Sequence, residues 1–398
     1  MTISQELLSQ ASEISTELIA LRRKLHQEPE FALQLPKTQA MILTEIESLG
    51  EITLGKNLTS IVLVIEGARP GPTVLLRADM DALSVQEETG LEFASSNGFM
   101  HACGHDLHMA SGVGAAKLLH RNKDRLAGKV AIWFQPGEEG HHGADVMIEE
   151  GMLEITGERP IAAYGLHVFT SLPLGVIATK PGAMMASAGD MHATFYGSGG
   201  HGSMPWLSKD PITPMVEAIS SLQVMLNKNF DQFDPVILNV GWIRAGDDAT
   251  TNVIADTASF GATVRTFSEQ STKKLHELAP KLIHAVADGY GVKADVTFSR
   301  ATKVLMNDTA AVESVRKVAK ELVGEAGYQE MATPIAGGED YASIVAEVPG
   351  AFVFLGACPP EVDHLSAPTN HSSRAMFDDS VIPLGAALLA SLAFEHLG

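Results

Sequence analysis

Apolar residues near the start of the chain recur at helical spacing. Ala11, Ile14, Leu18, Leu21 and Leu25 follow one another in steps of three or four residues, which is the spacing of one face of an α-helix. The pattern predicts an amphipathic helix in this region.

Short apolar runs and longer helical patterns then alternate along the chain. Nearly continuous apolar runs indicate strands buried on both faces, and their alternation with helices favours a mostly parallel sheet covered on both sides. The predicted strands lie at 59–65, 73–76, 130–134 and 161–164, and the predicted helices lie at 106–120 and 147–154.

The order of the elements changes after about residue 188. A strand, a helix, two strands, a helix and a strand follow, which is the order of a ferredoxin-like α+β domain. They are predicted at 191–196, 211–226, 235–241, 258–265, 269–290 and 292–298. After Arg300 the α/β pattern resumes, with a helix at 309–326, a strand at 351–355 and a helix at 380–395. We therefore predict an α/β domain in two parts, 1–187 and 301–398, split by an inserted α+β domain at 188–300.

Composition and charge exclude some classes of partner. Of the 398 residues, 45% are hydrophobic and 19% are charged, which is typical of a globular protein. The formal net charge is −20, whereas nucleic acids and anionic membranes attract clusters of lysine and arginine. We expect neither as a partner.

Cysteine content and apolar runs bear on the compartment. Cys103 and Cys358 are the two cysteines, too few for a disulfide framework, which favours a reducing compartment. The start of the chain lacks the basic and apolar regions of a secretory signal. The longest apolar stretch, near 383–394, is shorter than the roughly 18–20 residues of a membrane span. A cytoplasmic protein is predicted.

Polar residues follow several predicted strands directly. Asp79 and Asp81 follow one strand, Glu138 and Glu139 follow the next, and His167 follows a third. Ligands of open α/β sheets bind beyond the carboxyl ends of the strands. We therefore expect these side chains to lie near one another.

A cluster of metal-binding residue types opens the helix that precedes the Glu pair. Three histidines, Cys103 and Asp106 lie within the eight residues from His101 to His108. Imidazole nitrogen and thiolate sulfur are ligands for zinc and similar metals, and Cys103 and His105 can face one ion from an extended loop. A lone cysteine or histidine is more often a packing or capping residue, but this density favours a metal site.

The neighbouring Glu138 and Glu139 could divide the work of hydrolysis. Adjacent side chains diverge, so one carboxylate can bind a metal while the other takes a proton from the attacking water. The spacing leaves open which of the two does which, and a solvated loop is the alternative interpretation.

Other residues could complete such a site. His167 and His371 add imidazoles, although each taken alone is typical of a buried or turn histidine. Asp79 and Asp81 could either bind a metal directly or orient a ligating histidine. Together with the cluster around Cys103, these side chains would suffice for one or two ions.

The predicted small domain carries candidates for substrate binding. His201 lies among glycines and could donate a hydrogen bond to an oxyanion. Asn252 and Arg265 could bind a substrate carboxylate, which arginine holds through two parallel hydrogen bonds. Outside that domain, Gly337 lies in a glycine-rich turn of the 301–398 segment and could bring backbone N–H groups to the substrate. Each is also typical of a turn or a surface ion pair.

These segments, in this order, resemble the M20 metallopeptidase family. The similarity is greatest to its aminoacylase/amidohydrolase branch, which includes hippurate hydrolases, auxin-conjugate hydrolases and N-acyl-amino-acid deacylases. It runs from Leu21 to Ser373. The motifs are LRRKLHQEPE, LLRADMDAL, MHACGHDLHMA, FQPGEEG, GLHV, GGHGSMP, TNVIAD, ATVRTF, GGEDY and NHSS. Ser84, Gly137 and Ala255 depart from residues common in the family, and none of the three is a ligand position.

The resemblance implies roles for individual residues. The positions that match the family's metal ligands are Cys103, His105, Glu139, His167 and His371. Glu138 matches the general base, and His201 matches the oxyanion-stabilising histidine, which in the family usually reaches the partner subunit's active site. Asn252 and Arg265 match positions on the carboxylate side of the substrate. The implied fold is a split α/β metal-binding domain with a ferredoxin-like lid that dimerises.

The resemblance also implies a reaction. We expect a homodimeric, metal-dependent amidohydrolase that carries two divalent ions per subunit and splits an N-acyl amino acid into a carboxylate and a free amino acid. Zinc suits a thiolate with imidazoles, and manganese, cobalt or nickel are alternatives. A dipeptidase or exopeptidase of the same family is a second hypothesis. A non-catalytic metal-binding paralogue is a third, against which the presence of all five ligand positions and both glutamates argues.

Overall fold

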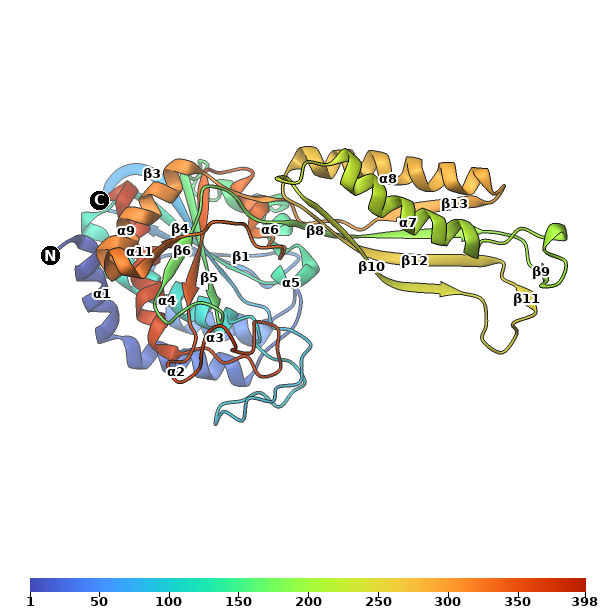
Figure 1. The fold of residues 1–398 in the computed structure, drawn as a ribbon. Coiled ribbons are helices and arrows are strands. Elements are labelled where there is room, and N and C mark those ends of the chain that lie inside the picture. The colour runs from blue at the N-terminus through green and yellow to red at the C-terminus, as the bar shows by residue number, and fades with distance from the viewer. The chain divides into compact units, whose positions relative to one another are not determined.

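The computed structural model describes all residues from 1 to 398 and consists of two units (Figure 1). The larger unit comprises Met1–Met184, Met306–Thr333 and Asp340–Gly398, and the smaller comprises Met185–Leu305 and Pro334–Glu339. The predicted insert, 188–300, lies within the smaller unit. Residues 334–339 also belong to the smaller unit, whereas the predicted bounds assign them to the α/β domain; they form no helix or strand and so carry no periodic signal.

An eight-stranded mixed sheet forms the centre of the larger unit, in the order β1-β2-β4-β3-β5-β16-β6-β15. The strands are β1 (Glu51–Leu54), β2 (Ile61–Glu66), β3 (Arg69–Asp79), β4 (Ala127–Gln135), β5 (Ala162–Phe169), β6 (Ile177–Thr179), β15 (Tyr328–Glu330) and β16 (Gly350–Gly356). The central strands β4, β3, β5 and β16 are parallel, but the pairs β1–β2, β2–β4 and β16–β6 are antiparallel. The prediction of a mostly parallel sheet holds for the centre and for the β6–β15 pair at the edge, and the three antiparallel pairs depart from it.

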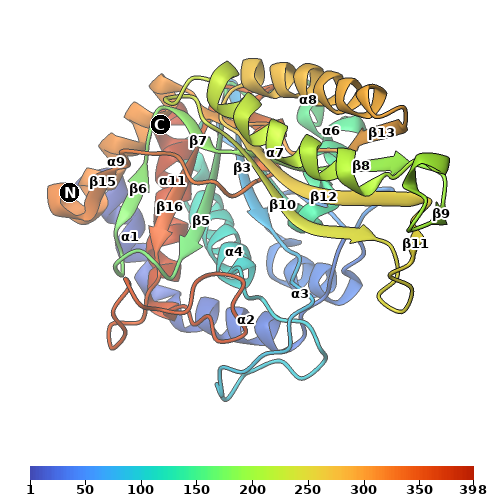
Figure 2. The ribbon, with the colours of Figure 1, turned by 45° about the vertical axis from the view of Figure 1, so that its right-hand side comes forward.

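Helices cover both faces of this sheet. The helices are α1 (Ile3–Glu13), α2 (Ser15–Gln27), α3 (Pro36–Ile46), α4 (His105–Arg121), α5 (Glu138–His141), α6 (Gly143–Glu149), α9 (Thr309–Gly327), α10 (Tyr341–Val345) and α11 (Ile382–Leu397). Helices α1, α4, α9 and α11 pack together over one face, with α4 and α11 running beside β5 and β16 (Figure 2). The short helices α6 and α10 lie over the other face. The α/β class of this unit is thus confirmed.

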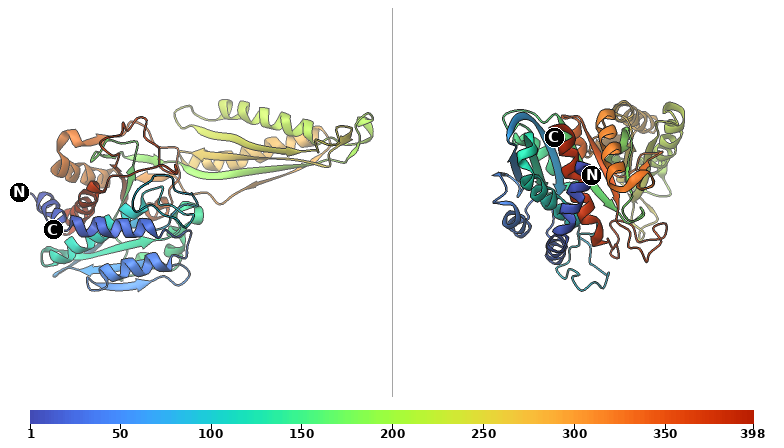
Figure 3. Two further views of the ribbon diagram at one scale, coloured as in Figure 1. Left: turned by 90° about the horizontal axis from the view of Figure 1, so that it is seen from below. Right: turned by 90° about the vertical axis from the view of Figure 1, so that its left-hand side faces the viewer.

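The N-terminal pattern forms two helices instead of the single helix predicted. Ile14, between α1 and α2, has φ −102° and ψ 8°, which is outside helical geometry. Apolar residues continue at helical spacing across the break, so periodicity alone could not reveal it. Because α1 packs against α11, both chain ends lie at the same side of the unit (Figure 3).

The last helix is longer than its apolar stretch suggested. Residues Asp379–Leu397 form a helical segment of 19 residues that is long and apolar enough to cross a membrane, so our estimate of its length was too low. However, 72% of this segment is buried inside the molecule, where α11 packs between α1, α4 and α9. The segment therefore has the burial of a core helix.

The smaller unit is a ferredoxin-like α+β domain. Its elements are β8 (Ser187–Tyr196), β9 (Gly200–His201), α7 (Ile212–Asn229), β10 (Val236–Ala245), β11 (Val253–Ile254), β12 (Thr257–Thr266), α8 (Glu269–Gly289) and β13 (Lys293–Phe298). The main sheet has the order β10-β12-β8-β13 and is antiparallel throughout. Helices α7 and α8 cover one of its faces (Figure 1), and Phe195, Leu222 and Phe260 are central in the core between them. Elsewhere, β7 (Gly182–Met185) and β14 (Leu305–Asn307) form a separate two-stranded sheet.

Candidate functional site

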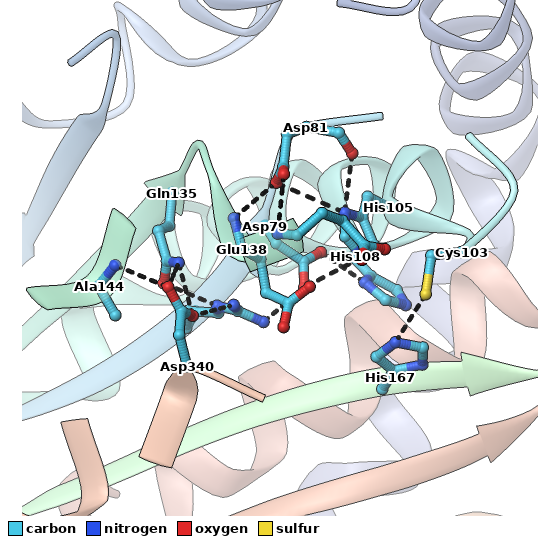
Figure 4. Close-up of polar contacts among 12 residues, drawn as sticks. Asp79, Asp81, Cys103, His105, His108, Gln135, Glu138, Ala144, His167 and Asp340 are labelled. Atoms are coloured by element: carbon cyan, nitrogen blue, oxygen red, sulfur yellow. Dashed lines mark hydrogen bonds and ion pairs between the residues drawn. The ribbon is translucent and has the colours of Figure 1, made fainter. Parts of the chain in front are cut away.

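Three parallel strands of the larger unit end at the same edge of its sheet. Asp79, the last residue of β3, is paired in register with Gln135 at the end of β4. On the other side of β3, Arg77 is paired with Gly165 of β5, two residues before His167. Parallel pairing thus brings together polar residues that lie far apart in the sequence (Figure 4).

The Cys103 thiol lies at the centre of the predicted metal ligands. Its Sγ is 3.3 Å from Nε2 of His167 and 3.2 Å from Nε2 of His371. Ligand atoms of Cys103, His105 and His167 lie within 4.8 Å of one another, and so do those of Cys103, Glu139 and His371. The structure therefore brings all five predicted ligands together as two triads that share the thiol.

The donor set fits metal cations. Nε2 of His105 is buried and has no hydrogen-bond partner, so this nitrogen can bind an ion once it has lost its proton. Hydrogen bonds to Cys103 and Glu139 raise the pKa of His371 to about 10. Burial alone would lower the pKa of His105, but the Asp79 carboxylate, together with contacts to Asp81 and Cys103, raises that pKa well above its usual value. The centre therefore attracts positive charge, and sulfur with imidazole nitrogen suits zinc.

Asp81 holds three of the predicted functional residues. Its main-chain oxygen lies 2.8 Å from Nδ1 of His105, which places the proton on Nδ1 and directs Nε2 toward the centre. Its carboxylate accepts hydrogen bonds from the backbone N–H of Glu138 at 2.9 Å and of Glu139 at 3.0 Å. Of the two roles open for Asp81, this geometry favours orientation over direct ligation.

Asp79 is likewise surrounded by partners. Its Oδ1 lies 2.6 Å from Nδ1 of His108, and its Oδ2 forms a buried ion pair with Arg77. The backbone N–H of Val168 donates to Nε2 of His108 at 2.8 Å, so the proton of that ring is on Nδ1. His108 therefore links Asp79 to the strand that carries His167. Because ion pairs and hydrogen bonds occupy its carboxylate, Asp79 also fits an orienting role.

Glu138 opens α5, a single distorted turn with non-helical dihedral angles at Glu139 and Gly140, within a loop of unusual backbone conformation. Gly137, Gly140 and His142 all have positive φ values, of 75°, 77° and 55°. The Glu138 side chain is buried, and its carboxylate lies within 4.8 Å of ligand atoms of His105 and Glu139. A carboxylate in this place can reach a water molecule beside the predicted ligands.

The centre opens to solvent at His371. Its side chain is 56% exposed, whereas Cys103, His105 and His167 are buried. His371 has φ 73° and donates its backbone N–H to the Ala102 carbonyl at 2.9 Å. Such strained positions in non-glycine residues cluster at functional sites, which is consistent with a ligand at the mouth of the centre.

The predicted substrate residues of the smaller unit form two separate groups. His201 is paired in register with Val253, next to Asn252, beyond the end of the sheet where Thr257 meets Tyr196. Arg265 lies at the opposite end and donates to the Ala336 carbonyl at 3.1 Å. The strand between them spans roughly 25 Å at 3.3 Å per residue.

Gly337 packs beside Arg265 and not near His201. Its carbonyl accepts a hydrogen bond from the N–H of Ala186 at 3.0 Å. The Gly337 position is tight, because an added Cβ would lie 3.3 Å from the end of Met185. Within this unit, the structure thus shows a backbone contact for Gly337, and its role toward a substrate stays a prediction.

The sequence assigns no individual role to several residues at the centre. His108 has the role described above, and Asn370 donates to the carbonyls of Val168 at 2.9 Å and Cys103 at 3.2 Å. Both lie within motifs beside predicted ligands, so their position in the sequence was a signal. Asp340 accepts hydrogen bonds from Arg77 and Gln135. Its signal in the sequence is weaker, because the motif that contains it stands out for its two glycines and not for its carboxylates.

Comparison with known proteins agrees with this geometry. Residues 75–395 match the family described as "Peptidase family M20/M25/M40". Thermostable carboxypeptidase 1 of Saccharolobus solfataricus is 33% identical, covering 99% of both chains, and N-acetylcysteine deacetylase of Bacillus subtilis is 34% identical, covering 95% of this chain and 96% of that one. A Bacillus subtilis structure described as a dinuclear metal binding peptidase from the M20 family superposes with a TM-score of 0.81. It is 32% identical and covers 96% of this chain and 98% of that chain.

The match spans most of the chain, and the relatives are similar along nearly their whole length. The fold, the candidate metal sites and the motifs all point to the same group of enzymes. The chain belongs to peptidase family M20/M25/M40 and is a metal-dependent hydrolase of its amidohydrolase branch.

Proposed function

We propose that this enzyme hydrolyses N-acyl amino acids to a carboxylate and a free amino acid with the help of two divalent metal ions. The observation that carries the proposal is the pair of donor triads that share Cys103, with the Glu138 carboxylate beside them. A relative named for the deacetylation of N-acetylcysteine supports the choice of substrate class.

Glu138 acts as the general base and then as the general acid. Bound metal ions supply a Lewis acid that polarises the acyl oxygen and lowers the pKa of water. Glu138 takes the proton of the attacking water and passes it to the amine nitrogen as the C–N bond breaks. Removal of such a base costs about 10²–10⁴ in rate.

His201 donates a hydrogen bond to the oxyanion. The backbone N–H of Ser203 donates to Nδ1 of His201 at 3.1 Å, so a neutral ring carries its proton on Nε2. This leaves Nε2 as a donor, and the ring is exposed. Asn252 and Arg265 are proposed to bind the carboxylate side of the substrate, as the family resemblance implies, and Gly337 to line that side.

A homodimer accounts for the separation between His201 and Arg265. The two residues lie at opposite ends of one sheet, so one substrate can meet both only if they come from different subunits. Strand β10 is an unpaired edge that exposes Ile237 and Ile243, and α7 exposes Val216 beside it. Light scattering of Ile243→Lys tests this proposal: a shift from dimer to monomer is expected, and a parent enzyme that is monomeric contradicts it.

Zinc is the proposed metal, and the cytoplasm is the proposed compartment. A thiolate with imidazoles suits zinc, with manganese, cobalt or nickel as alternatives. Both cysteines are free and buried, as in a protein of a reducing compartment. Metal content of the purified enzyme, measured without added metal, tests the first proposal. A metal-free protein that no added ion activates would favour a non-catalytic paralogue.

A peptidase is the second candidate, because one relative is named a carboxypeptidase. Turnover of an N-acyl amino acid and of the matching dipeptide with a free amine separates the two functions. We expect the acylated compound to be the better substrate and Glu138→Gln to retain its metal but lose turnover. Faster hydrolysis of the dipeptide would overturn the proposed substrate class.

A further inference from the structure

We propose that Asp340 is a positioning residue for Glu138: its carboxylate holds both ends of the loop, residues 135–144, that presents this base. The proposal rests on the proposed role of Glu138. It assigns a role to a residue that lies outside the predicted ligand and substrate sets.

The contacts of Asp340 reach the first and the last residue of the loop. Nε2 of Gln135, at the end of β4, donates to Oδ1 at 2.8 Å and to Oδ2 at 2.9 Å. The backbone N–H of Ala144, at the start of α6, donates to Oδ2 at 2.9 Å. Arg77 donates to Oδ1 at 3.1 Å. One carboxylate thus joins two points nine residues apart in the chain (Figure 4).

The loop needs such external partners. Three of its residues have positive φ values, and a bend of this kind is not stabilised by a regular ladder of hydrogen bonds. Asp81 holds the middle of the loop through the N–H groups of Glu138 and Glu139, and Asp340 holds the ends. Together, two carboxylates fix the loop from both sides.

Asp340 also lies close to the base itself. Its carboxylate oxygen and that of Glu138 are within 4.8 Å of each other, and both residues are buried. A displacement of Asp340 or of its donors would therefore move Glu138 directly. Misplacement of a reacting group by about 1 Å can cost about 10²-fold in rate.

The charge state of Asp340 is compatible with this role. Burial raises the pKa of Asp340 to about 6, although Arg77 and the N–H donors oppose the increase. At neutral pH the group is therefore mostly ionised. Both oxygens of a carboxylate can accept these hydrogen bonds. An asparagine would replace one of the oxygens with an NH₂ group, which would face the N–H donors of the neighbouring residues and could not accept from them.

The test compares Asp340→Asn with Glu138→Gln and a matched control. The control is Asp308→Asn, because Asp308 also accepts a backbone N–H, that of Ala311 at 2.9 Å, but caps α9 away from the loop. Each holoenzyme is assayed for kcat, KM and metal content with an N-acyl amino acid. Hydrogen exchange of the backbone amides from 137 to 146 is followed by mass spectrometry.

For Asp340→Asn we expect kcat to fall about 10- to 100-fold, as is typical when a residue that orients an active-site group by hydrogen bonding is replaced. KM should change less than about threefold, metal content should stay as in the parent, and amide exchange should accelerate in the loop. Gln135→Ala, which removes one of the two ends, should shift the same readouts in the same direction. Asp308→Asn should leave all of them unchanged.

Two results would overturn the inference. One is an Asp340→Asn enzyme with parent kcat or parent exchange in the loop, and the other is a loss of kcat fully explained by lost metal or by unfolded protein. Failure of the proposed function has a different signature, because Glu138→Gln would then turn over at the parent rate whatever Asp340→Asn does.

Discussion

Nδ1 of His105 lies 2.8 Å from the main-chain oxygen of Asp81. This contact fixes the tautomer of the ring and turns its other nitrogen toward Cys103 and Glu139. The Asp81 carboxylate meanwhile binds the backbone on which Glu138 and Glu139 lie. One residue therefore aligns a predicted ligand of each kind, imidazole and carboxylate, together with the proposed base.

Asp81→Asn should impair metal binding and turnover without unfolding the protein. The asparagine amide would place an N–H donor where one carboxylate oxygen now accepts a backbone N–H. The main-chain contact to His105 would remain. We expect about 10- to 100-fold weaker metal binding or lower activity, measured by competition with a chromophoric chelator and by kcat. Asp363→Asn, at an exposed turn, is the control. Parent metal affinity and kcat in Asp81→Asn would contradict the role we assign to Asp81.

Cys103→Ser should weaken both proposed metal sites, since both triads contain this sulfur. A serine hydroxyl is a poorer ligand for zinc than a thiolate. The variant should bind fewer than two ions per chain after dialysis, as elemental analysis would show. Cys358→Ser is the matched control, because Cys358 is also buried but its thiol donates to the Val362 carbonyl and belongs to neither triad. Two tightly held ions in Cys103→Ser would refute a shared thiolate.

Metal binding should release protons, that of the Cys103 thiol among them, and become tighter as the pH rises. Burial, aided by the nearby Glu139 carboxylate, raises the pKa of the Cys103 thiol, so the metal-free protein holds the thiol protonated at neutral pH. A ligating sulfur must lose this proton. Apparent affinity should therefore increase up to about tenfold per pH unit for each proton released. Calorimetry in buffers of different ionisation enthalpy measures the proton count, which should be smaller in Cys103→Ser.

Much of the site could be predicted because strand ends and motifs carry strong local signals. Asp79, Glu138 and His167 follow apolar strands, and parallel pairing brings strand ends to one edge. Other features depend on long-range contacts that leave no periodic trace. The two ends of the loop that Asp340 joins are about 200 residues away from it in the sequence.

The helices and strands of the fold also differ in how well the sequence predicts them, and their length decides the outcome. The predicted bounds are close to the observed ones for α7, α8, β8, β10 and β12. Each of these elements is long enough for regularly spaced apolar residues to show its type. The strands β1, β6 and β15 have only three or four residues each, too few to show a period. The sequence does not predict these three strands. Two of them, β1 and β6, pair with their neighbours in antiparallel orientation, which differs from the mostly parallel sheet that we expect.

Glu87→Gln should make the protein less sensitive to acid. Burial alone would raise the pKa of Glu87, but hydrogen bonds from His26, Thr89 and the Ser95 N–H outweigh it and lower the pKa to about 2. The folded state thus favours the ionised form, and this stabilisation is present above about pH 4.5 and is lost as the pH falls toward 2.

Urea unfolding of the metal-free protein measures this effect. The parent should be more stable than Glu87→Gln at pH 6, and the difference should shrink steadily between pH 4.5 and pH 2. Glu88→Gln, the same change at the neighbouring exposed position, is the control. A difference between parent and Glu87→Gln that stays constant with pH would contradict the assignment.

Gly143→Ala should damage catalysis through the shape of the loop that carries Glu138. A Cβ at this position would lie 1.8 Å from the Pro136 carbonyl oxygen, a rigid backbone atom, so the loop must shift by more than 1 Å. The same shift would disturb the hydrogen bond from the Gly143 N–H to the Gly137 carbonyl, which closes the loop at 3.0 Å. We expect overpacking to lower the free energy of unfolding by about 1–3 kcal/mol, and kcat to fall by about 10²-fold. Gly289→Ala is the control, because its added Cβ would meet no atom within 4 Å beyond the adjacent backbone of α8 and its φ is not positive. That variant should keep kcat and remain within about 1 kcal/mol of the parent. If Gly143→Ala kept the parent kcat, the loop would tolerate displacement, and the rigid placement of Glu138 would lose its physical basis.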